Sequence, residues 1–119
     1  MTQYLVAIHH PDNYDPSTED EAMHRDIDVL NDQMVAAGVR IFVGGLRPAR
    51  DARSLRKKPD GEMLLTDGPY LETKEYIASF YLLDCESEER AHQIAADMPF
   101  ADVDPVEVWP VMHEAKPDL

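Results

Sequence analysis

The sequence predicts an α+β fold in which two helices cover one face of a four-stranded sheet. Four stretches are rich in apolar residues and have the length of strands, at residues 3–9, 39–43, 76–84 and 105–112. Two other stretches repeat apolar residues every three or four positions, which is the period of a helix packed on a core. Their order along the chain is strand, helix, strand, strand, helix, strand.

The first strand and the first helix are separated by a polar turn. Residues 3–9 alternate between two faces that are both largely apolar, and residues 12–16 break the strand. Ser17 or Thr18 is the expected N-cap of the helix, because the acidic residues that follow suit the positive end of the helix dipole. The predicted core stripe of this helix, which Gly38 ends, consists of Met23, Ile27, Leu30 and Met34.

The middle of the chain predicts a strand, a hairpin and another strand. Residues 39–43 form the strand, and a polar excursion follows at residues 46–58. We expect the end of this excursion to pair with residues 62–65 across the Pro59-Asp60-Gly61 turn as a β-hairpin. Residues 76–84 form the strongest predicted strand, with aromatic and aliphatic residues on both faces.

The second helix has a cap and a stop. Ser87 is its expected N-cap, and Pro99 prevents its continuation. Residues 105–112 form the last strand. The predicted inner side of the helix consists of Ala91, Ile94, Ala95 and Met98.

Without the hairpin, the order of elements is the βαββαβ arrangement of ferredoxin-like folds, so we expect a ferredoxin-like domain with a β-hairpin insertion. Two helices cover only one face of a four-stranded sheet. The strands are apolar on both faces, and an uncovered apolar face is unusual for a monomer. We therefore expect a symmetric homodimer, a dimeric α+β barrel in which the sheets pack face to face.

Length and charge limit the classes of function. The 119 residues fit one domain. The sequence has neither a stretch of roughly 20 apolar residues nor a signal segment, so we expect a cytoplasmic protein without membrane association. The net charge of -13 argues against nucleic acid as a partner. Cys85, the single cysteine, is expected to be structural.

The positive charges are gathered in one segment. Residues 47–58 hold six of the eleven Lys and Arg residues and one acid, so their net charge is about +5 and that of the rest about -18. The segment suits an anionic small molecule or the acidic surface of another subunit, and it is equally consistent with a solvated hairpin.

Two neighbouring histidines are candidates for a metal site. His9 and His10 are followed by Asp12. Adjacent residues of a strand point to opposite faces, however, so the two rings do not easily share one ion. We therefore expect no metal. The sequence also has no phosphate-binding glycine loop, and we expect no cofactor. His92 and His113 fall on exposed or terminal positions.

His24 is the best placed histidine for catalysis. It lies beside the core stripe of the first helix, at the boundary between core and solvent. In that position a histidine is either structural or, if it lines a cleft, a general acid or base. Asp67, or Asp28 one turn later, is expected to orient its ring.

Residues 65–75, reading LTDGPYLETKE, form the most informative segment. Gly68 can adopt a positive φ and Pro69 lacks a backbone donor, so the chain turns there. Charged residues and a hydroxyl follow at once, which is typical of a solvated loop or of a polar site. The candidate substrate-binding residues are Arg47, Gly68, Pro69, Glu72, Thr73 and Lys74, and Asp67 is a candidate catalytic residue beside His24.

This segment resembles the signature of the DGPF group of the YCII-related family, with Tyr70 where phenylalanine is usual. The similarity continues at residues 78–82 (ASFYL), and weaker matches at residues 36–38, 44–48 and 60–61 extend it over nearly the whole chain. The resemblance implies one dimeric ferredoxin-like domain, which we place at residues 1–113. We expect residues 114–119 to form a C-terminal tail.

The resemblance also implies a pair of catalytic residues. The better understood relatives look like small-molecule enzymes that use a histidine in the first helix and an aspartate directly before a proline at the end of the second. His24 matches the histidine. Met98 precedes Pro99 here, and Asp97 lies one residue early, which turns its side chain by about 100° around the helix. Either Asp67 takes this role, or this branch lacks the chemistry.

Two hypotheses of function follow. The first is a cofactor-independent enzyme of lyase or isomerase type that acts on a small anionic organic molecule, with His24 moving a proton and Arg47 or Lys74 holding the negative charge. The second is a non-catalytic domain that binds a metabolite or regulates a partner. Some relatives lie beside or are fused to extracytoplasmic-function sigma factors, so a sigma factor is the partner that the resemblance suggests.

Overall fold

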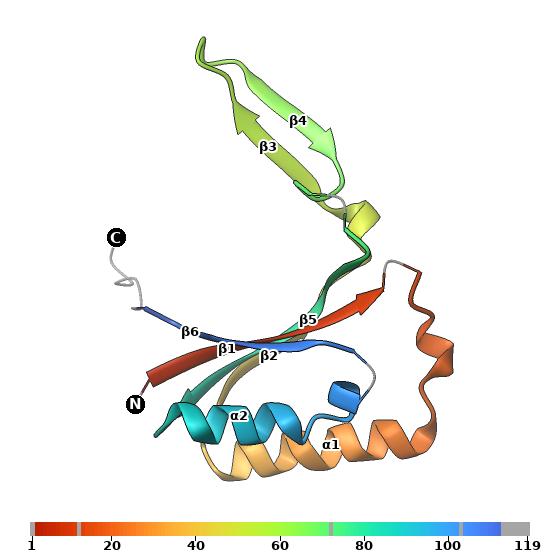
Figure 1. Cartoon of the computed structure of the whole chain (residues 1–119), viewed down its shortest axis with the longest axis vertical. Coiled ribbons are helices and arrows are strands. Elements are labelled where there is room, and N and C mark those ends of the chain that lie inside the picture. Colours follow the sequence, from red (N-terminus) through yellow and green to blue (C-terminus); the bar gives the residue numbers. More distant parts are fainter. Residues whose placement is uncertain (1, 12, 72, 103, 113–119) are drawn as a thin grey trace.

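The computed structural model describes residues 2–11, 13–71, 73–102 and 104–112 and has an α+β fold (Figure 1). The described residues form two α-helices, six strands and three short 3-10 turns. The main elements are β1 (Thr2–Pro11), α1 (Glu21–Ala36), β2 (Arg40–Gly45), β3 (Arg53–Lys57), β4 (Met63–Asp67), β5 (Glu75–Cys85), α2 (Glu88–Ala96) and β6 (Val106–Pro110). The 3-10 turns are η1 (Pro16–Thr18), η2 (Ala49–Asp51) and η3 (Pro99–Asp102).

Four strands form the main sheet in the order β2-β5-β1-β6, and each neighbouring pair is antiparallel. The pairing of β1 with β5 is interrupted once, because Ile8 pairs with Ser79 and His9 with Ile77, which leaves Ala78 as an extra residue. This bulge lies at the end of β1 where His10 and Pro11 follow. The sheet is therefore irregular where the site described below is found.

Both helices lie on the same face of the sheet (Figure 1). The core between them is apolar, and the predicted inner faces are confirmed: Leu30 and Met34 of α1 are buried, as are the four residues predicted for the second helix. Met23 and Ile27 are only half-buried. Cys85 is fully buried, and burial raises the pKa of its thiol, as suits a structural residue.

The first helix begins later than predicted. Asp20 is its N-cap, and the Asp20 carboxylate accepts a hydrogen bond of 2.8 Å from the Met23 N–H. Ser17 and Thr18 lie instead in η1, where the Ser17 N–H donates to the Asp15 carboxylate. This local turn competes with the cap, so the prediction of Ser17 or Thr18 was wrong. Ser87 caps α2 as predicted, through the Arg90 N–H.

No described helix covers the other face of the sheet. Leu5 pairs with both Leu82 and Trp109, which therefore share one face, and Phe42 pairs with Leu82 from the edge strand. Phe42 and Trp109 are each about half exposed. This uncovered apolar face is defined by Leu5, Phe42, Phe80, Leu82 and Trp109.

The predicted hairpin is present and stands apart from the body. Strands β3 and β4 form a separate two-stranded sheet, with Leu55 opposite Leu65. Gly61 adopts a φ of +88° in the turn, which favours glycine. We call residues 53–67 the arm. Figure 1 shows that the arm projects from the end of the sheet, on the side opposite to the helices.

Candidate functional site

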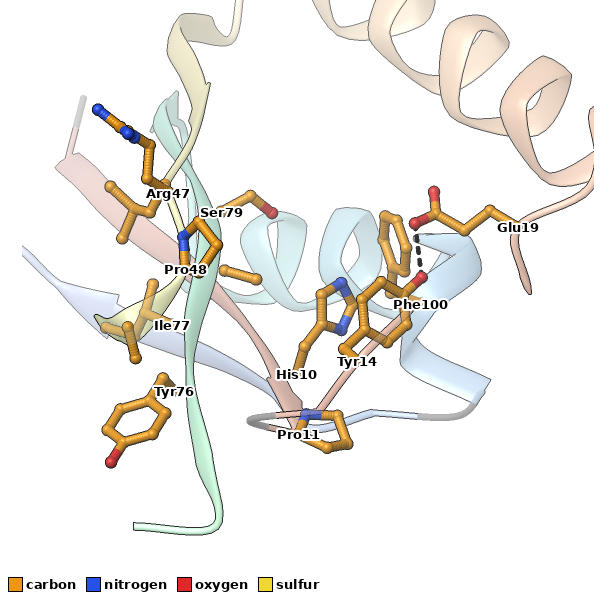
Figure 2. A pocket seen from close by; sticks show the side chains of 13 residues that line it. His10, Pro11, Tyr14, Glu19, Arg47, Pro48, Tyr76, Ile77, Ser79 and Phe100 are labelled. Carbon is orange, nitrogen blue, oxygen red and sulfur yellow. Dashed lines mark hydrogen bonds between the residues drawn. The ribbon is translucent and has the colours of Figure 1, made fainter. Parts of the chain in front are cut away.

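A cavity of about 370 Å³ opens where the end of β1 meets the connection between β2 and η2. Figure 2 shows His10, Tyr14, Glu19 and Phe100 along one wall, with Arg47, Pro48 and Ile77 on the opposite side. Most of its lining is apolar, and its polar groups are few. A pocket of this size and character suits a small organic molecule.

His10 and Asp104 form the central pair of this site. His10 Nδ1 lies 2.8 Å from Asp104 Oδ2, and the two side chains are 11% and 10% exposed. The end of β1 is held next to the segment that carries Asp104, because the His9 N–H donates to the Pro105 carbonyl at 3.0 Å. Residues 94 positions apart in sequence are thus brought into contact.

The hydrogen bond to Asp104 determines the form of the neutral His10 ring. An ionised carboxylate only accepts hydrogen bonds, so Nδ1 carries the proton and Nε2 has the free lone pair. No described side chain bonds to Nε2. A histidine held by a carboxylate at one nitrogen, with the other free beside a cavity, has the arrangement of a general base.

Tyr14 fixes the plane of the His10 ring. The two rings are stacked with centroids 3.8 Å apart and an angle of 12° between their planes. Phe100 contacts the His10 ring at an angle of 65°, with centroids 5.1 Å apart. His10 is therefore packed on aromatic surfaces as well as bonded to Asp104.

Tyr14 connects this ring to Glu19 and His24. Its hydroxyl donates a hydrogen bond of 2.5 Å to Glu19 Oε2, the dashed line in Figure 2, and His24 Nε2 lies 3.3 Å from Glu19 Oε1. Burial, together with the hydrogen bond to Glu19 and the charge of that carboxylate, raises the pKa of Tyr14 to about 12. The phenol therefore stays protonated at neutral pH.

The opposite wall supplies the cationic group. Arg47 lies at the mouth of the cavity, with Nε 3.3 Å from the Asp51 carboxylate, and its side chain is mostly exposed. Ser79 adds a hydroxyl next to the bulge in β5. One end of the cavity thus carries His10, with the carboxylates of Glu19 and Asp104 nearby. The other end carries Arg47.

The predicted catalytic residues are not brought together within this chain. His24 is paired with Glu19 and 58% exposed, and it does not line the cavity. Asp67 lies on the arm, 89% exposed, with Oδ1 3.2 Å from Arg53 Nε. Glu19, rather than Asp67 or Asp28, contacts the His24 ring.

The predicted substrate-binding residues are divided between the cavity and its surroundings. Arg47 lines the cavity, and Pro69 lines an adjoining hollow that shares Arg47 with it. Gly68 has a φ of +86°, and its N–H donates to the Ala52 carbonyl, so its role is to close the base of the arm. The Thr73 N–H donates to the Tyr76 hydroxyl, and Lys74 is exposed. Glu72 lies outside the described residues.

Sequence reasoning missed four residues of the site: His10, Asp104, Tyr14 and Glu19. The two neighbouring histidines have different partners: His9 contacts Glu107 and His10 contacts Asp104. His10 was considered in the sequence only as a metal ligand and not as a base. The available signal was the ring of Tyr14 four residues after His10, while nothing local in the sequence points to Asp104.

Among the residues that the structure describes, no three His, Cys, Asp or Glu side chains are grouped as metal ligands. Nor is any described helix long and apolar enough to cross a membrane.

Comparison with known proteins places the chain in a family. The family model for the YCII-related domain matches residues 1–115. The chain belongs to the YCII-related family. An uncharacterised protein of Rhizobium meliloti (strain 1021) is 40% identical over 80 residues, which are 67% of this chain and 64% of that protein. The match thus spans less than two thirds of the relative's length.

Within this YCII-related chain, the position before Pro99 belongs to the core. Met98 is only 2% exposed, and the Asp97 side chain is exposed at the end of α2. The carboxylate bonded to His10 at the cavity comes instead from Asp104, beyond η3.

Proposed function

We propose that this protein is a cofactor-independent enzyme, of lyase or isomerase type, that moves a proton on a small organic molecule bound in the cavity. His10 is the general acid or base in this proposal, and Asp104 holds its ring. The observation that carries the proposal is the His10–Asp104 pair, 2.8 Å apart and nearly buried, whose histidine lines the cavity.

His24 has a supporting role in this mechanism. It reaches the cavity only through Glu19 and Tyr14, so it acts as a positioning residue. Its imidazole keeps Glu19 in place, Glu19 holds the Tyr14 hydroxyl, and the Tyr14 ring supports His10. Loss of His24 is therefore expected to reduce the rate less than loss of His10.

The charges of the cavity indicate how a substrate lies. Glu19 and Asp104 disfavour a negative group at the histidine end, whereas Arg47 favours one at the other end. We propose that the substrate is a small, flat organic acid. Its anionic group faces Arg47, and the acidic O–H or C–H faces His10 Nε2.

We also propose that the chain is a ferredoxin-like domain that forms a homodimer, as a dimeric α+β barrel. The strand order β2-β5-β1-β6, with both helices on one face, supports the ferredoxin-like arrangement. The uncovered apolar face supports the dimer, because Phe42 and Trp109 stay exposed in a single chain.

Hydrogen exchange at carbon tests the proposed activity even when the product of the reaction is not identified. The protein is incubated in D₂O with a panel of small keto, enol and hydroxyaromatic acids, and deuterium incorporation is followed by ¹H NMR. We expect exchange for at least one class, reduced by about 100-fold or more in His10→Gln. His92→Gln, an exposed histidine outside the cavity, is the matched control. Equal rates in the wild type and His10→Gln would remove His10 from the chemistry.

Binding without turnover is the second candidate function. The position of Asp67 on the arm, away from His24, favours it, since the pair implied by the family resemblance is not assembled in this chain. In that case panel members bind in the cavity, as seen by NMR shifts of the Ile77 methyl groups, and none of them exchanges.

A further inference from the structure

The arm has little support from its own chain. Strands β3 and β4 pack on each other, and neither makes an extensive contact with another described element. The base is closed by two bonds, from the Gly68 N–H to the Ala52 carbonyl and from the Ser54 hydroxyl to the Gly68 carbonyl. A two-stranded hairpin without further packing is marginally stable in water. Another surface is therefore needed to hold it.

One face of the arm is apolar at its centre and charged at its ends. Leu55 and Leu65 are directly opposite each other, and they are 65% and 60% exposed. Met63 lies on the same face, opposite Lys57, while the Arg53–Asp67 pair closes the other end. An apolar centre within a charged rim is typical of a protein contact surface.

The arm and the uncovered apolar face border the same space. Figure 1 shows the helices on one side of the sheet and the arm rising on the other. The space beside the arm is thus the space that a second chain occupies when it packs on the uncovered apolar face. One occupant covers both surfaces.

The arm enlarges the contact surface that the sheet face offers. Strands β1, β2, β5 and β6 hold 10, 6, 11 and 5 residues, so at about 3.3 Å per residue and about 4.8 Å between strands they present roughly 500 Å² in projection. Stable interfaces take about 800 Å² of accessible surface from each partner. The exposed side chains of Leu55, Met63 and Leu65 add apolar surface to that of the sheet.

Charge favours a second copy of this chain as the occupant. Residues 47–58, which include β3 and the root of the arm, carry about +5, and the remaining residues about -18. The cationic strand of one copy therefore meets the acidic body of the other with opposite sign. Lys57 forms no ion pair with a described residue, which leaves it available for such a contact.

We propose that the arm of each chain clasps the second chain of the homodimer, with Leu55, Met63 and Leu65 against the partner and the cations of β3 against its acidic surface. This inference rests on the proposed homodimer.

The dissociation constant of the dimer, measured by sedimentation equilibrium, tests it. We expect Leu55→Ser/Leu65→Ser to raise the dissociation constant by about tenfold or more, because four exposed leucines per dimer lose apolar contact. Val29→Ser/Val35→Ser, with similar exposure on α1, is the matched control and is expected to leave it unchanged. Both pairs lie outside the buried core, so the circular dichroism spectra of the variants are expected to stay close to that of the wild type.

The outcomes separate the clasp from the dimer itself. A wild-type monomer at micromolar concentration overturns both. A wild-type dimer whose dissociation constant is unchanged by the arm variant overturns the clasp alone.

Cross-linking gives a second measurement that does not depend on the variants. Carbodiimide joins Lys57 to nearby carboxylates in dimers mixed from ¹⁴N- and ¹⁵N-labelled chains. We expect Lys57 to be linked to an acid of the other isotope. Links confined to one isotope contradict the proposal.

Discussion

His10 is held by three neighbours, and each restricts it in a different way. Asp104 fixes which nitrogen is protonated, Tyr14 fixes the ring plane, and Phe100 closes the edge. The site is therefore organised before any ligand enters, as effective acid–base catalysis requires.

The tautomer of His10 is a direct prediction at this scale. We expect neutral His10 to carry its proton on Nδ1, because the Asp104 carboxylate accepts from that nitrogen. Two-bond ¹H–¹⁵N correlation spectra distinguish the two tautomers. In Asp104→Asn the amide can donate to Nδ1, so we expect a shift toward Nε2–H. A wild-type ring protonated mainly on Nε2 would refute the geometry given for this pair.

The contribution of Tyr14 to the free energy of unfolding depends on pH, and the raised pKa of Tyr14 sets the direction of that dependence. The pKa is about 12 in the folded chain and about 10 when unfolded. The contribution of Tyr14 to stability is thus complete below about pH 10 and is lost as the pH rises toward 12. We expect the free energy of unfolding of the wild type to exceed that of Tyr14→Phe by about 1 kcal/mol at pH 8, and the difference to shrink by pH 11. Urea unfolding at both pH values measures it, and a constant difference counts against the Glu19 bond.

At the scale of elements, regular patterns in the sequence predicted the structure well. The stripes of both helices and the hairpin turn depend on residues close in sequence, and they are confirmed. The start of α1 was wrong because Asp15 forms a turn with Ser17 that the pattern of caps does not reveal. The contact of His10 with Asp104 depends on the bulge in β5 and on η3, whose geometry is set by tertiary packing.

The N-caps of the two helices can be tested by substitution. We expect Asp20→Ala and Ser87→Ala each to lower the free energy of unfolding by about 1 kcal/mol, since each removes the acceptor of a first-turn N–H. Ser17→Ala, at the predicted cap that the structure rejects, is expected to change it by about 0.5 kcal/mol or less. Chemical denaturation compares the three. A larger effect of Ser17→Ala than of Asp20→Ala would restore the earlier start of the helix.

In the molecule as a whole, the two faces of the main sheet have different roles. The helix face holds the core, and its irregular end holds His10 and the cavity. The uncovered apolar face and the arm remain exposed in one chain. We expect the homodimer to protect these two surfaces while the cavity stays reachable by small molecules.

Substitution of His10 and of His24 in the same exchange reaction decides which of the two histidines transfers the proton. For the panel compound that exchanges fastest in D₂O, the rate is measured in the wild type, His10→Gln and His24→Gln. We predict a loss of about 100-fold or more in His10→Gln and a smaller loss in His24→Gln, because only His10 lines the cavity. A large loss in His24→Gln with His10→Gln still active would make His24, and not His10, the proton-transferring residue.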